Sequence, residues 1–519
     1  MAQEKSQLKI GIVLNYVNMI LGNLIPIFYT PIMLTLLGQS EYGLYKLASS
    51  VTSYLSLISM GLGSAITRYL IKSREEEGKD AEERMFGLFD VIFNVIAVAA
   101  LVIGTLLIRW IPTWYAKSLS TSELSRMQIL VLMMVVNMAL SFSQSPYFSV
   151  ANAHEKFLLP QSMNIVQTCG VPVLSLGALY MGFGSVGMTA AAMAVSILTR
   201  AAYQIYVRRK MQIHPRFRNL PTNELKEILS FSFWVFVANV VGQLYNATDI
   251  VMIGMIPALA TAGVAVYNVG GIFNSIMSNL TIGISSLLAP KTNKMVFQGA
   301  SNEELTNLAI RVGRIQGYIM MLIVSGFVAF GRPFIRFYVG DTYEDAYWVA
   351  ILMMIPNMIP LVQSICLNVV VAQNKHKFRS LVYLGIAILN VVGTWFLMRY
   401  MGIIGAALMT GVALIIGQGF VMNWYYHKKT GLDMLRFWKQ MLSVYIVPTL
   451  LCIGTLLLSN WIDFYKLPAL FTGIALYTVM YCGLNWLFTV NAYEKEMILG
   501  QMKLSLIHIS EPTRLGMIS

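Results

Sequence analysis

The feature that most constrains this chain is a series of long apolar runs that recurs along its whole length. An α-helix needs roughly 20 apolar residues to cross the hydrocarbon core of a bilayer. Lipid offers no partner to an unpaired backbone group, so each run must close its hydrogen bonds as a helix. Because 57% of the residues are hydrophobic and only 12% are charged, we expect an all-α polytopic membrane protein without a separate soluble domain.

The runs predict fourteen transmembrane helices in two blocks of six, followed by two more. The predicted spans are 10–37, 42–70, 85–108, 127–151, 159–181, 186–207, 230–253, 264–289, 315–330, 347–371, 381–398, 403–424, 441–458 and 467–488. This gives an N-lobe at 10–207 and a C-lobe at 230–424, with a basic cytoplasmic linker at 208–229 between them. Residues 1–9 form a cytoplasmic N-terminus, and 425–503 hold the last two spans and a cytoplasmic tail.

The distribution of basic residues predicts the orientation. With the N-terminus in the cytoplasm, 26 of the 37 Lys and Arg residues fall in inner segments and seven in outer ones, and the other four lie within spans or the final segment. Cytoplasmic loops carry such an excess, so both termini are predicted to be cytoplasmic. The membrane also accounts for the formal charge of +13, and no basic stretch suggests nucleic-acid binding.

The C-terminal residues break the preceding pattern. Residues 504–514 read LSLIHISEPTR, which looks like the translation of an adapter used in sequencing libraries. We therefore expect 504–519 to be a non-native tail and leave the native sequence after Lys503 open.

An internal repeat relates the two blocks at an offset of about 220 residues. The loop after the fourth span reads ANAHEKF from Ala151, and the loop after the tenth reads AQNKHKF from Ala372, so both fit A-x4-K-F. A G-x-x-G turn recurs at Gly184 and Gly402. An offset of six spans places both copies in the same orientation, and such parallel repeats meet about an axis normal to the membrane. We expect a central cleft there, lined by the first, second, seventh and eighth spans.

Polar side chains follow one face of several spans. The second span carries Ser49, Ser53 and Ser56 at helical spacing, and the seventh carries Asn239, Gln243, Asn246 and Asp249. Uncompensated polar groups are costly in lipid, so these faces meet either neighbouring helices or water. For the serines packing between helices is favoured, and for the amides with Asp249 the lining of the cleft is favoured. Two asparagines of the first span, Asn15 and Asn23, are likewise predicted to line the cleft.

Three charged residues lie within the predicted spans near their ends. Lys46, at the outer end of the second span, is either a snorkelling lysine or part of the cleft, where it could pair with Asp249 as an outer gate. Arg68, at the inner end, is either a topological anchor or a cation that receives an anionic group through paired charge-assisted hydrogen bonds. Asp90 is expected to neutralise Arg68 or another cation at the inner ends.

Two motifs carry a family resemblance. Residues 36–45 read LLGQSEYGLY and lead to MGLGSAITR at 60–68, and the seventh span contains TDIVMIG at 248–254. These segments resemble the oligosaccharide flippases of the polysaccharide-biosynthesis (Wzx-like) family, within the superfamily that also contains multidrug exporters. The resemblance covers about residues 8–490. It implies two six-helix lobes and transfer of an undecaprenyl-pyrophosphate-linked oligosaccharide from the inner to the outer leaflet of the bacterial cytoplasmic membrane.

Other functions remain open at this stage. A flippase for a peptidoglycan or other wall precursor would look alike, and a cation-coupled multidrug exporter could use Asp90 or Asp249. A membrane polymerase would need a large outer loop, and the outer segments are short.

There is no phosphate-loop motif, no evident metal cluster and no catalytic constellation. We therefore predict neither an enzyme nor a cofactor, and leave the coupling ion, H⁺ or Na⁺, open. The expected partners are the lipid-linked oligosaccharide and membrane lipids, with polysaccharide polymerase and glycosyltransferases as further candidates.

Overall fold

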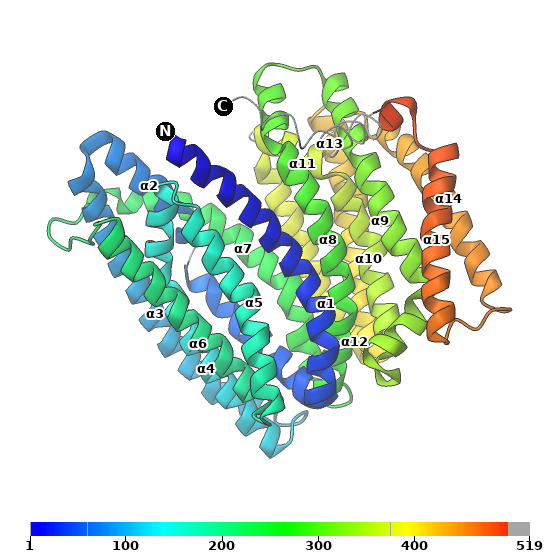
Figure 1. The fold of residues 1–519 in the computed structure, drawn as a ribbon, viewed down its shortest axis with the longest axis horizontal. Helices are drawn as coiled ribbons and strands as arrows, with labels where there is room; N and C mark the ends of the chain where they lie inside the picture. The colour runs from blue at the N-terminus through cyan, green and yellow to red at the C-terminus, as the bar shows by residue number, and fades with distance from the viewer. Residues whose placement is uncertain (1, 60, 374, 497–519) are drawn as a thin grey trace, which may run out of the picture. The chain divides into compact units, whose positions relative to one another are not determined.

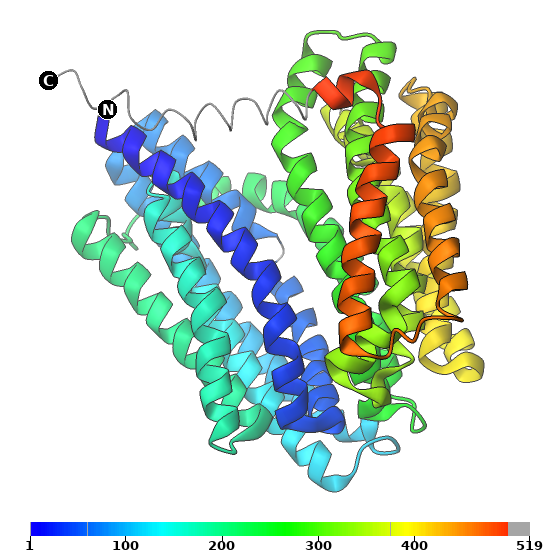
Figure 2. The same cartoon turned by 45° about the vertical axis from the view of Figure 1, so that its right-hand side comes forward.

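The computed structural model describes residues 2–59, 61–373 and 375–496, and every regular element in these ranges is a helix (Figures 1 and 2). The predicted foreign tail lies outside the described residues. The helices, in chain order, are α1 Ala2–Ser53, α2 Leu62–Glu77, α3 Lys79–Tyr115, α4 Thr121–Ala153, α5 Leu158–Tyr180, α6 Gly184–Ile205, α7 Leu225–Gly254, α8 Ala260–Phe297, α9 Asn302–Val339, α10 Ala346–Val362, α11 Ser364–Ala372, α12 His376–Leu414, α13 Asn423–Lys429, α14 Met434–Leu458 and α15 Leu467–Phe488. Short 3₁₀ or π turns at Tyr54–Ser59, Tyr206–Lys210, Thr222–Glu224, Asp341–Tyr343 and Ile415–Met422 join or extend them.

Local sequence sets several helix starts. Ser120 and Glu123 form a reciprocal capping box at the start of α4, and Ser301 and Glu304 form another at the start of α9. In each, the serine side chain accepts the backbone N–H three residues on, and the glutamate side chain accepts the serine N–H. Two unpaired donors at each helix start are thereby satisfied.

Two glycines interrupt the longest helices. Gly38 within α1 has φ 75°, ψ 167°, and Gly402 within α12 has φ 58°, ψ −140°, and neither conformation is helical. Gly184, the counterpart of Gly402 in the predicted repeat, has φ 57°. Glycine occupies this left-handed region without a steric penalty, so both copies of the G-x-x-G turn begin with the same φ.

Two predicted spans are broken rather than continuous. The predicted span 42–70 continues from α1 through the 3₁₀ turn Tyr54–Ser59 to a left-handed Gly61, after which α2 begins. The predicted span 347–371 is split between α10 and α11, which are bent by 46°. Pro356 and Pro360 precede that bend, and a proline inside a helix removes a backbone hydrogen bond and kinks it.

The described helices have the length and composition of membrane spans. Nine are long and apolar enough to cross a bilayer, or up to twelve if each of three bent pairs is one span. Two of the nine, Val13–Ser59 and Phe378–Lys429, have 47 and 52 residues, about twice the roughly 20 that one crossing needs. Each contains one of the two interrupting glycines. The predicted count of fourteen, in which both segments cross twice, stays a prediction.

Large apolar side chains cover the outside of these helices, among them Val95, Val173, Leu198, Leu381 and Leu450. A soluble protein rarely exposes contiguous apolar surface of this extent. The exposed apolar surface and the span lengths show a multi-pass membrane protein.

The described chain forms two compact units. Unit 1 comprises Met1–Ile276, Trp348–Met353 and Lys377–Gly417, and unit 2 comprises Met277–Tyr347, Met354–His376 and Gln418–Ser519. In unit 1, α3 packs against α4, α4 against α6, and α1 against α5 and α7. In unit 2, α9 contacts α14 and α15. The predicted division into lobes at 10–207 and 230–424 follows different boundaries and stays a prediction.

Candidate functional site

The polar faces predicted on the second and seventh spans meet each other inside unit 1. The Gln243 amide nitrogen on α7 donates to the Ser53 hydroxyl at the end of α1. Five residues after Gln243 on α7, the Thr248 hydroxyl lies 2.5 Å from the Tyr54 hydroxyl. Two of the predicted stripe residues, Ser53 and Gln243, therefore serve helix packing in this structure.

Asp249 lies at the centre of a buried hydrogen-bond cluster. Its side chain is 2% exposed. Tyr267 of α8 and Thr410 of α12 donate hydroxyl hydrogen bonds to its Oδ2 at 2.6 and 2.7 Å, and the Asn390 amide approaches its Oδ1 at 3.4 Å. Thr394 and Thr410 in turn donate to the Asn390 carbonyl oxygen at 3.2 and 3.1 Å. Three helices thus converge on one carboxylate.

The chemistry of this cluster suits a small cation or a proton. Within the described ranges no Lys or Arg forms an ion pair with Asp249, and the groups that contact its carboxylate are neutral. A carboxylate buried in a membrane protein is a functional-site candidate by default. Oxygen ligands are those that hard cations prefer, and Asp249, Asn390, Thr394 and Thr410 supply them from α7 and α12. These four residues are the ones that could hold a coupling ion.

Among the described residues, Lys46 and Asp249 form no ion pair with each other. The Lys46 ammonium lies 5.5 Å from the centre of the Tyr42 ring and 6.0 Å from that of Tyr45. Asp249 accepts hydrogen bonds from α8 and α12. The outer gate between the two residues stays a prediction.

Among the described residues, the hydrogen bonds to the Asp249 carboxylate come from Tyr267, Thr410 and Asn390, none of which is a predicted site residue. Arg68 is exposed on α2, with its guanidinium 5.9 Å from the Tyr69 ring. Asn239 and Asn15 are exposed on their helices, and the Asn23 amide donates to Met19 O of its own helix at 2.8 Å. The side chain of Asn246 lies outside what the structure describes. The assignment of these residues to a substrate cleft stays a prediction.

Asp90 is 8% exposed on α3, and its backbone carbonyl accepts a hydrogen bond from the Asn94 amide at 2.7 Å. Its neutralisation of Arg68 or another cation at the inner ends stays a prediction. Arg208 donates to the Tyr147 hydroxyl at 2.7 Å.

A polar junction links α1, α4 and α8 at the predicted outer side of unit 1. The Ser40 hydroxyl donates to Glu123 at 2.7 Å and lies 3.1 Å from the Thr261 hydroxyl. Burial raises the pKa of the Glu123 carboxyl, but hydrogen bonds from Ser120, Ser40 and Thr261 outweigh burial and bring this pKa below its usual value. Gly43 lies against the α8 start so closely that a Cβ there would be 1.8 Å from the Thr261 carbonyl oxygen.

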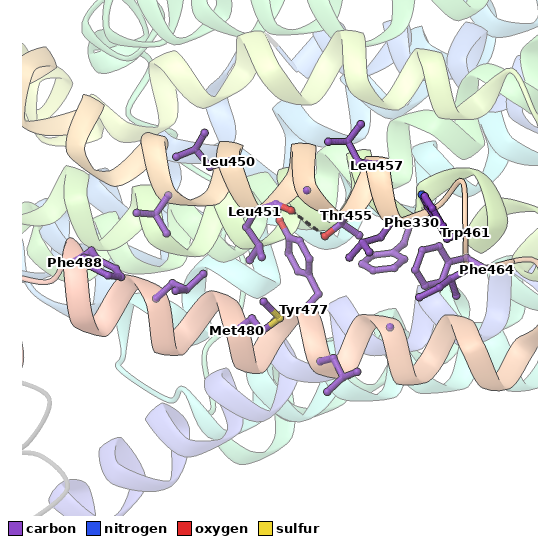
Figure 3. A pocket seen from close by; sticks show the side chains of 17 residues that line it. Phe330, Leu450, Leu451, Thr455, Leu457, Trp461, Phe464, Tyr477, Met480 and Phe488 are labelled. Carbon is purple, nitrogen blue, oxygen red and sulfur yellow. Dashed lines mark hydrogen bonds between the residues drawn. The ribbon is translucent and has the colours of Figure 1, made fainter.

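Unit 2 contains an apolar groove between α14 and α15 (Figure 3). Its volume is about 930 Å³. Phe330 of α9 forms its floor, with the Phe464 and Tyr477 rings edge-on at centroid distances of 5.0 and 5.7 Å. The one labelled hydroxyl on α14, that of Thr455, donates to Leu451 O at 2.9 Å. The groove therefore presents little besides hydrocarbon and aromatic surface.

Comparison with known proteins identifies the family. Residues 8–295 match the family described as "Polysaccharide biosynthesis protein". The chain belongs to this family. A curated relative is the "Uncharacterized membrane protein EpsK" of Bacillus subtilis (strain 168), which is 20% identical over 429 residues, with 80% of this chain and 82% of the relative covered.

Solved structures show the same fold. A lipid II flippase, MurJ, in an inward closed conformation matches with a TM-score of 0.73 at 16% identity, covering 92% of this chain and 98% of that chain. An inward-facing multidrug transporter of the MATE family and the MOP superfamily gives a TM-score of 0.63 at 12% identity, with coverage of 80% and 99%. The Vibrio cholerae MATE transporter VcmN gives 0.57 at 17% identity, with coverage of 82% and 98%. The predicted family and the all-α polytopic fold are confirmed, and the three neighbours are themselves a flippase and two transporters.

Three residues of the Asp249 cluster were missed from the sequence: Asn390, Thr394 and Thr410. They are separated from Asp249 by more than 140 residues, and each sits alone or in a pair on an apolar span. The i, i+4 spacing of Asn390 and Thr394 on one predicted span is the signal that could have found them.

Proposed function

We propose that this protein is a flippase that moves an undecaprenyl-pyrophosphate-linked oligosaccharide across the bacterial cytoplasmic membrane by alternating access, for surface polysaccharide biosynthesis. The observation that carries the proposal is the family match over residues 8–295. That match contains α1, α2 and α7, whose polar faces were predicted to line the transport path. Membrane lipids surround the protein, polysaccharide polymerase and glycosyltransferases are proposed partners, and both termini are proposed to be cytoplasmic.

The chemistry of the described residues suits each part of such a substrate. A saccharide needs neutral hydrogen-bonding groups, and the exposed Asn239 supplies one on α7. A pyrophosphate needs a cation able to form paired charge-assisted hydrogen bonds, which Arg68 provides at the predicted inner end. The polyprenyl tail needs only the hydrocarbon of the surrounding bilayer.

Asp249 is proposed as the group that couples transport to an ion gradient. Binding of H⁺ or Na⁺ would neutralise the carboxylate and change its hydrogen bonds to α8 and α12. An ion can shift a conformational equilibrium only through a difference in affinity between the two states. Because the ligands of Asp249 come from separate helices, a movement of α12 against α7 would create that difference.

The test is translocation by purified protein in vesicles. Vesicles carry a fluorescent undecaprenyl-pyrophosphate oligosaccharide, and its appearance in the outer leaflet is followed with a membrane-impermeant quencher under an imposed Na⁺ or proton gradient. We expect wild-type protein to translocate the lipid and Asp249→Asn to lose the dependence on the gradient. Asp463→Asn is the matched control, since it makes the same change at an exposed acid in the turn before α15. Absence of translocation in wild-type vesicles under both gradients would refute the flippase proposal.

A second candidate is a flippase for a peptidoglycan or other wall precursor lipid. It is proposed because this chain shares its fold with a lipid II flippase over 92% of its length. Including lipid II in the same vesicles decides between the two, because faster transfer of lipid II than of the oligosaccharide lipid would favour this candidate. Transfer of a cationic dye alone would point to a multidrug exporter.

A further inference from the structure

A basic cavity lies at one end of unit 1. Residues from the α2–α3 junction, from the α4–α5 junction and from the end of α6 line it. Its volume is about 600 Å³, within the roughly 300–1,000 Å³ typical of ligand pockets. Four cationic side chains line it: Arg74, Lys79, Lys156 and Lys210. This end is the predicted cytoplasmic one, and the cavity contains none of the residues assigned above to the transport path.

Lys156 is the lysine of the A-x4-K-F motif. The backbone at this residue turns back toward the C-terminus of α4. Glu155 has φ 55°, a left-handed conformation that is rare for a residue other than glycine. The Lys156 N–H then bonds to Ala151 O at 3.0 Å, closing the C-terminus of α4. Within the described chain the Lys156 ammonium has no acidic partner within 4.0 Å. The motif therefore places an unneutralised cation in the cavity wall.

Lys210 lines the cavity from an irregular turn at the end of α6. Residues Tyr206–Lys210 form a π turn that extends α6, and such turns are frequent at functional sites. The turn separates two neighbouring cations, because Arg208 donates to Tyr147 in the interior while Lys210 lies over the Tyr206 ring at 5.3 Å. Lys210 also has no acid within ion-pair distance among the described residues.

The other cations are held in place by backbone contacts. Arg74 donates to Ala153 O at 3.1 Å, and Lys79 donates to Gln212 O at 3.0 Å. The acid in the lining is Glu82, which is 1% exposed and lies 2.7 Å from the His154 imidazole. Glu82 is thus engaged with His154. Arg74 also contacts Glu75 at 3.3 Å and Lys79 lies 4.0 Å from Glu83, so the two cations without an acidic partner among the described residues are Lys156 and Lys210.

We propose that this cavity binds a phosphate-bearing group at the cytoplasmic surface. Lysine and arginine N–H groups form short, charge-assisted hydrogen bonds to phosphate oxygens. Basic pockets between transmembrane helices on the cytoplasmic side bind anionic lipid headgroups. The same chemistry would also take a free phosphate or pyrophosphate. The proposal does not depend on the transported substrate.

The experiment titrates two probes against the full chain purified in neutral detergent. The probes are phosphatidylglycerol, followed by native mass spectrometry, and inorganic pyrophosphate, followed by calorimetry. The variants are Lys156→Gln, Lys210→Gln and the pair, with Lys226→Gln as the control, since Lys226 is an exposed lysine near the same end and outside the cavity. Elution volume and helicity verify folding, and the single variants serve if the pair does not fold.

We expect wild-type protein and Lys226→Gln to bind at least one probe equally well. Each single cavity variant should bind about 5-fold more weakly and the pair about 30-fold, given the contribution of each basic residue near a membrane surface. Binding of phosphatidylglycerol identifies a lipid headgroup as the source, and binding of pyrophosphate alone identifies a soluble phosphate. Binding of neither probe, or equal binding by the paired variant, overturns the proposal.

Discussion

Single residues decide what each end of unit 1 can do. Arg68 is exposed on α2 at the predicted cytoplasmic end, and Asp249 is buried among neutral donors on α7, α8 and α12. An exposed guanidinium costs little to keep charged and can meet an incoming anion. A buried carboxylate is costly to ionise unless it is paired. The two residues are therefore suited to different tasks, recognition and coupling.

Arg68→Ala should lower polysaccharide export about 10- to 100-fold in a complementation assay, the range that follows from losing charge-assisted hydrogen bonds. Arg68→Lys should retain part of the activity, because lysine keeps the charge but not the paired donors. Arg109→Ala, at the predicted outer end of α3, is the control and should export normally. If both Arg68 variants also export normally at equal protein levels, Arg68 is only a topological anchor.

The sequence predicted one member of the buried cluster and missed its partners. Asp249 stood out because it follows Asn239, Gln243 and Asn246 at helical spacing. Thr410 carried no such pattern, and Asn390 and Thr394 form only one i, i+4 pair on an otherwise apolar span, which is a much weaker signal than the four polar residues of α7. Tertiary packing decides which helices face one another, and a single sequence does not show which pairs will pack together.

At the scale of helices, the contact of α1 with the start of α8 depends on the missing side chain of Gly43. Gly43→Ala would place a carbon 1.8 Å from Thr261 O and 2.6 Å from Thr261 C, both backbone atoms that cannot rotate away. The two helices would have to separate, at a cost of about 1–3 kcal/mol for overpacking.

The separation can be measured by crosslinking. Ser40→Cys and Thr261→Cys, in a background without the four native cysteines, should form a disulfide readily, because the two native hydroxyl oxygens are 3.1 Å apart. Adding Gly43→Ala should reduce its yield. Gly22→Ala, also in α1 but with nothing near its Cβ position, should leave the yield unchanged. Equal yields with and without Gly43→Ala would contradict the close contact.

The last two helices are anchored to α9 by a buried ion pair in unit 2. Arg314 contacts Glu494 with Nε–Oε1 at 2.6 Å, and the two side chains are 4% and 5% exposed. The remaining N–H groups of the Arg314 guanidinium donate to Gln440 O, Ser443, Tyr318 and Thr489 O. One guanidinium thus holds α14 and the segment after α15.

Arg314→Met should destabilise the protein by about 3–5 kcal/mol, because it leaves the Glu494 carboxylate buried without a partner. The double variant Arg314→Met with Glu494→Leu should recover most of that loss. Thermal unfolding in detergent measures both. Asp341→Asn is the control, since it breaks an ion pair with Arg336 whose side chains are 53% and 71% exposed, and should cost less than about 1 kcal/mol. A double variant as unstable as Arg314→Met would refute the account.

The elements were predicted better than their interruptions. The predicted span 467–488 coincides with α15, because apolar composition alone defines a helix that faces lipid. The break after Ser59 was not foreseen, since Gly61 and Gly63 are common enough in membrane helices to carry no signal by themselves. The bend between α10 and α11 does have a signal in the sequence, because Pro356 and Pro360 precede it.

At the scale of the whole molecule, the orientation across the membrane rests on the distribution of basic residues. Arg218→Cys in the linker and Ile462→Cys in the turn before α15 test it in the cysteine-free background. In intact cells a membrane-impermeant maleimide should label Cys at 462 and not at 218. Permeabilised cells should label both, which verifies that position 218 is reactive. Labelling at 218 alone in intact cells would reverse the predicted topology.

The Arg314–Glu494 pair also has a consequence for biosynthesis. The two residues are 180 positions apart, and a ribosome that adds about 5–20 residues per second needs roughly 9 to 36 seconds to make that stretch. During this time the arginine of α9 is already at the translocon without its final partner. A chain interrupted before residue 494 therefore lacks the carboxylate that pairs with Arg314 in the folded protein.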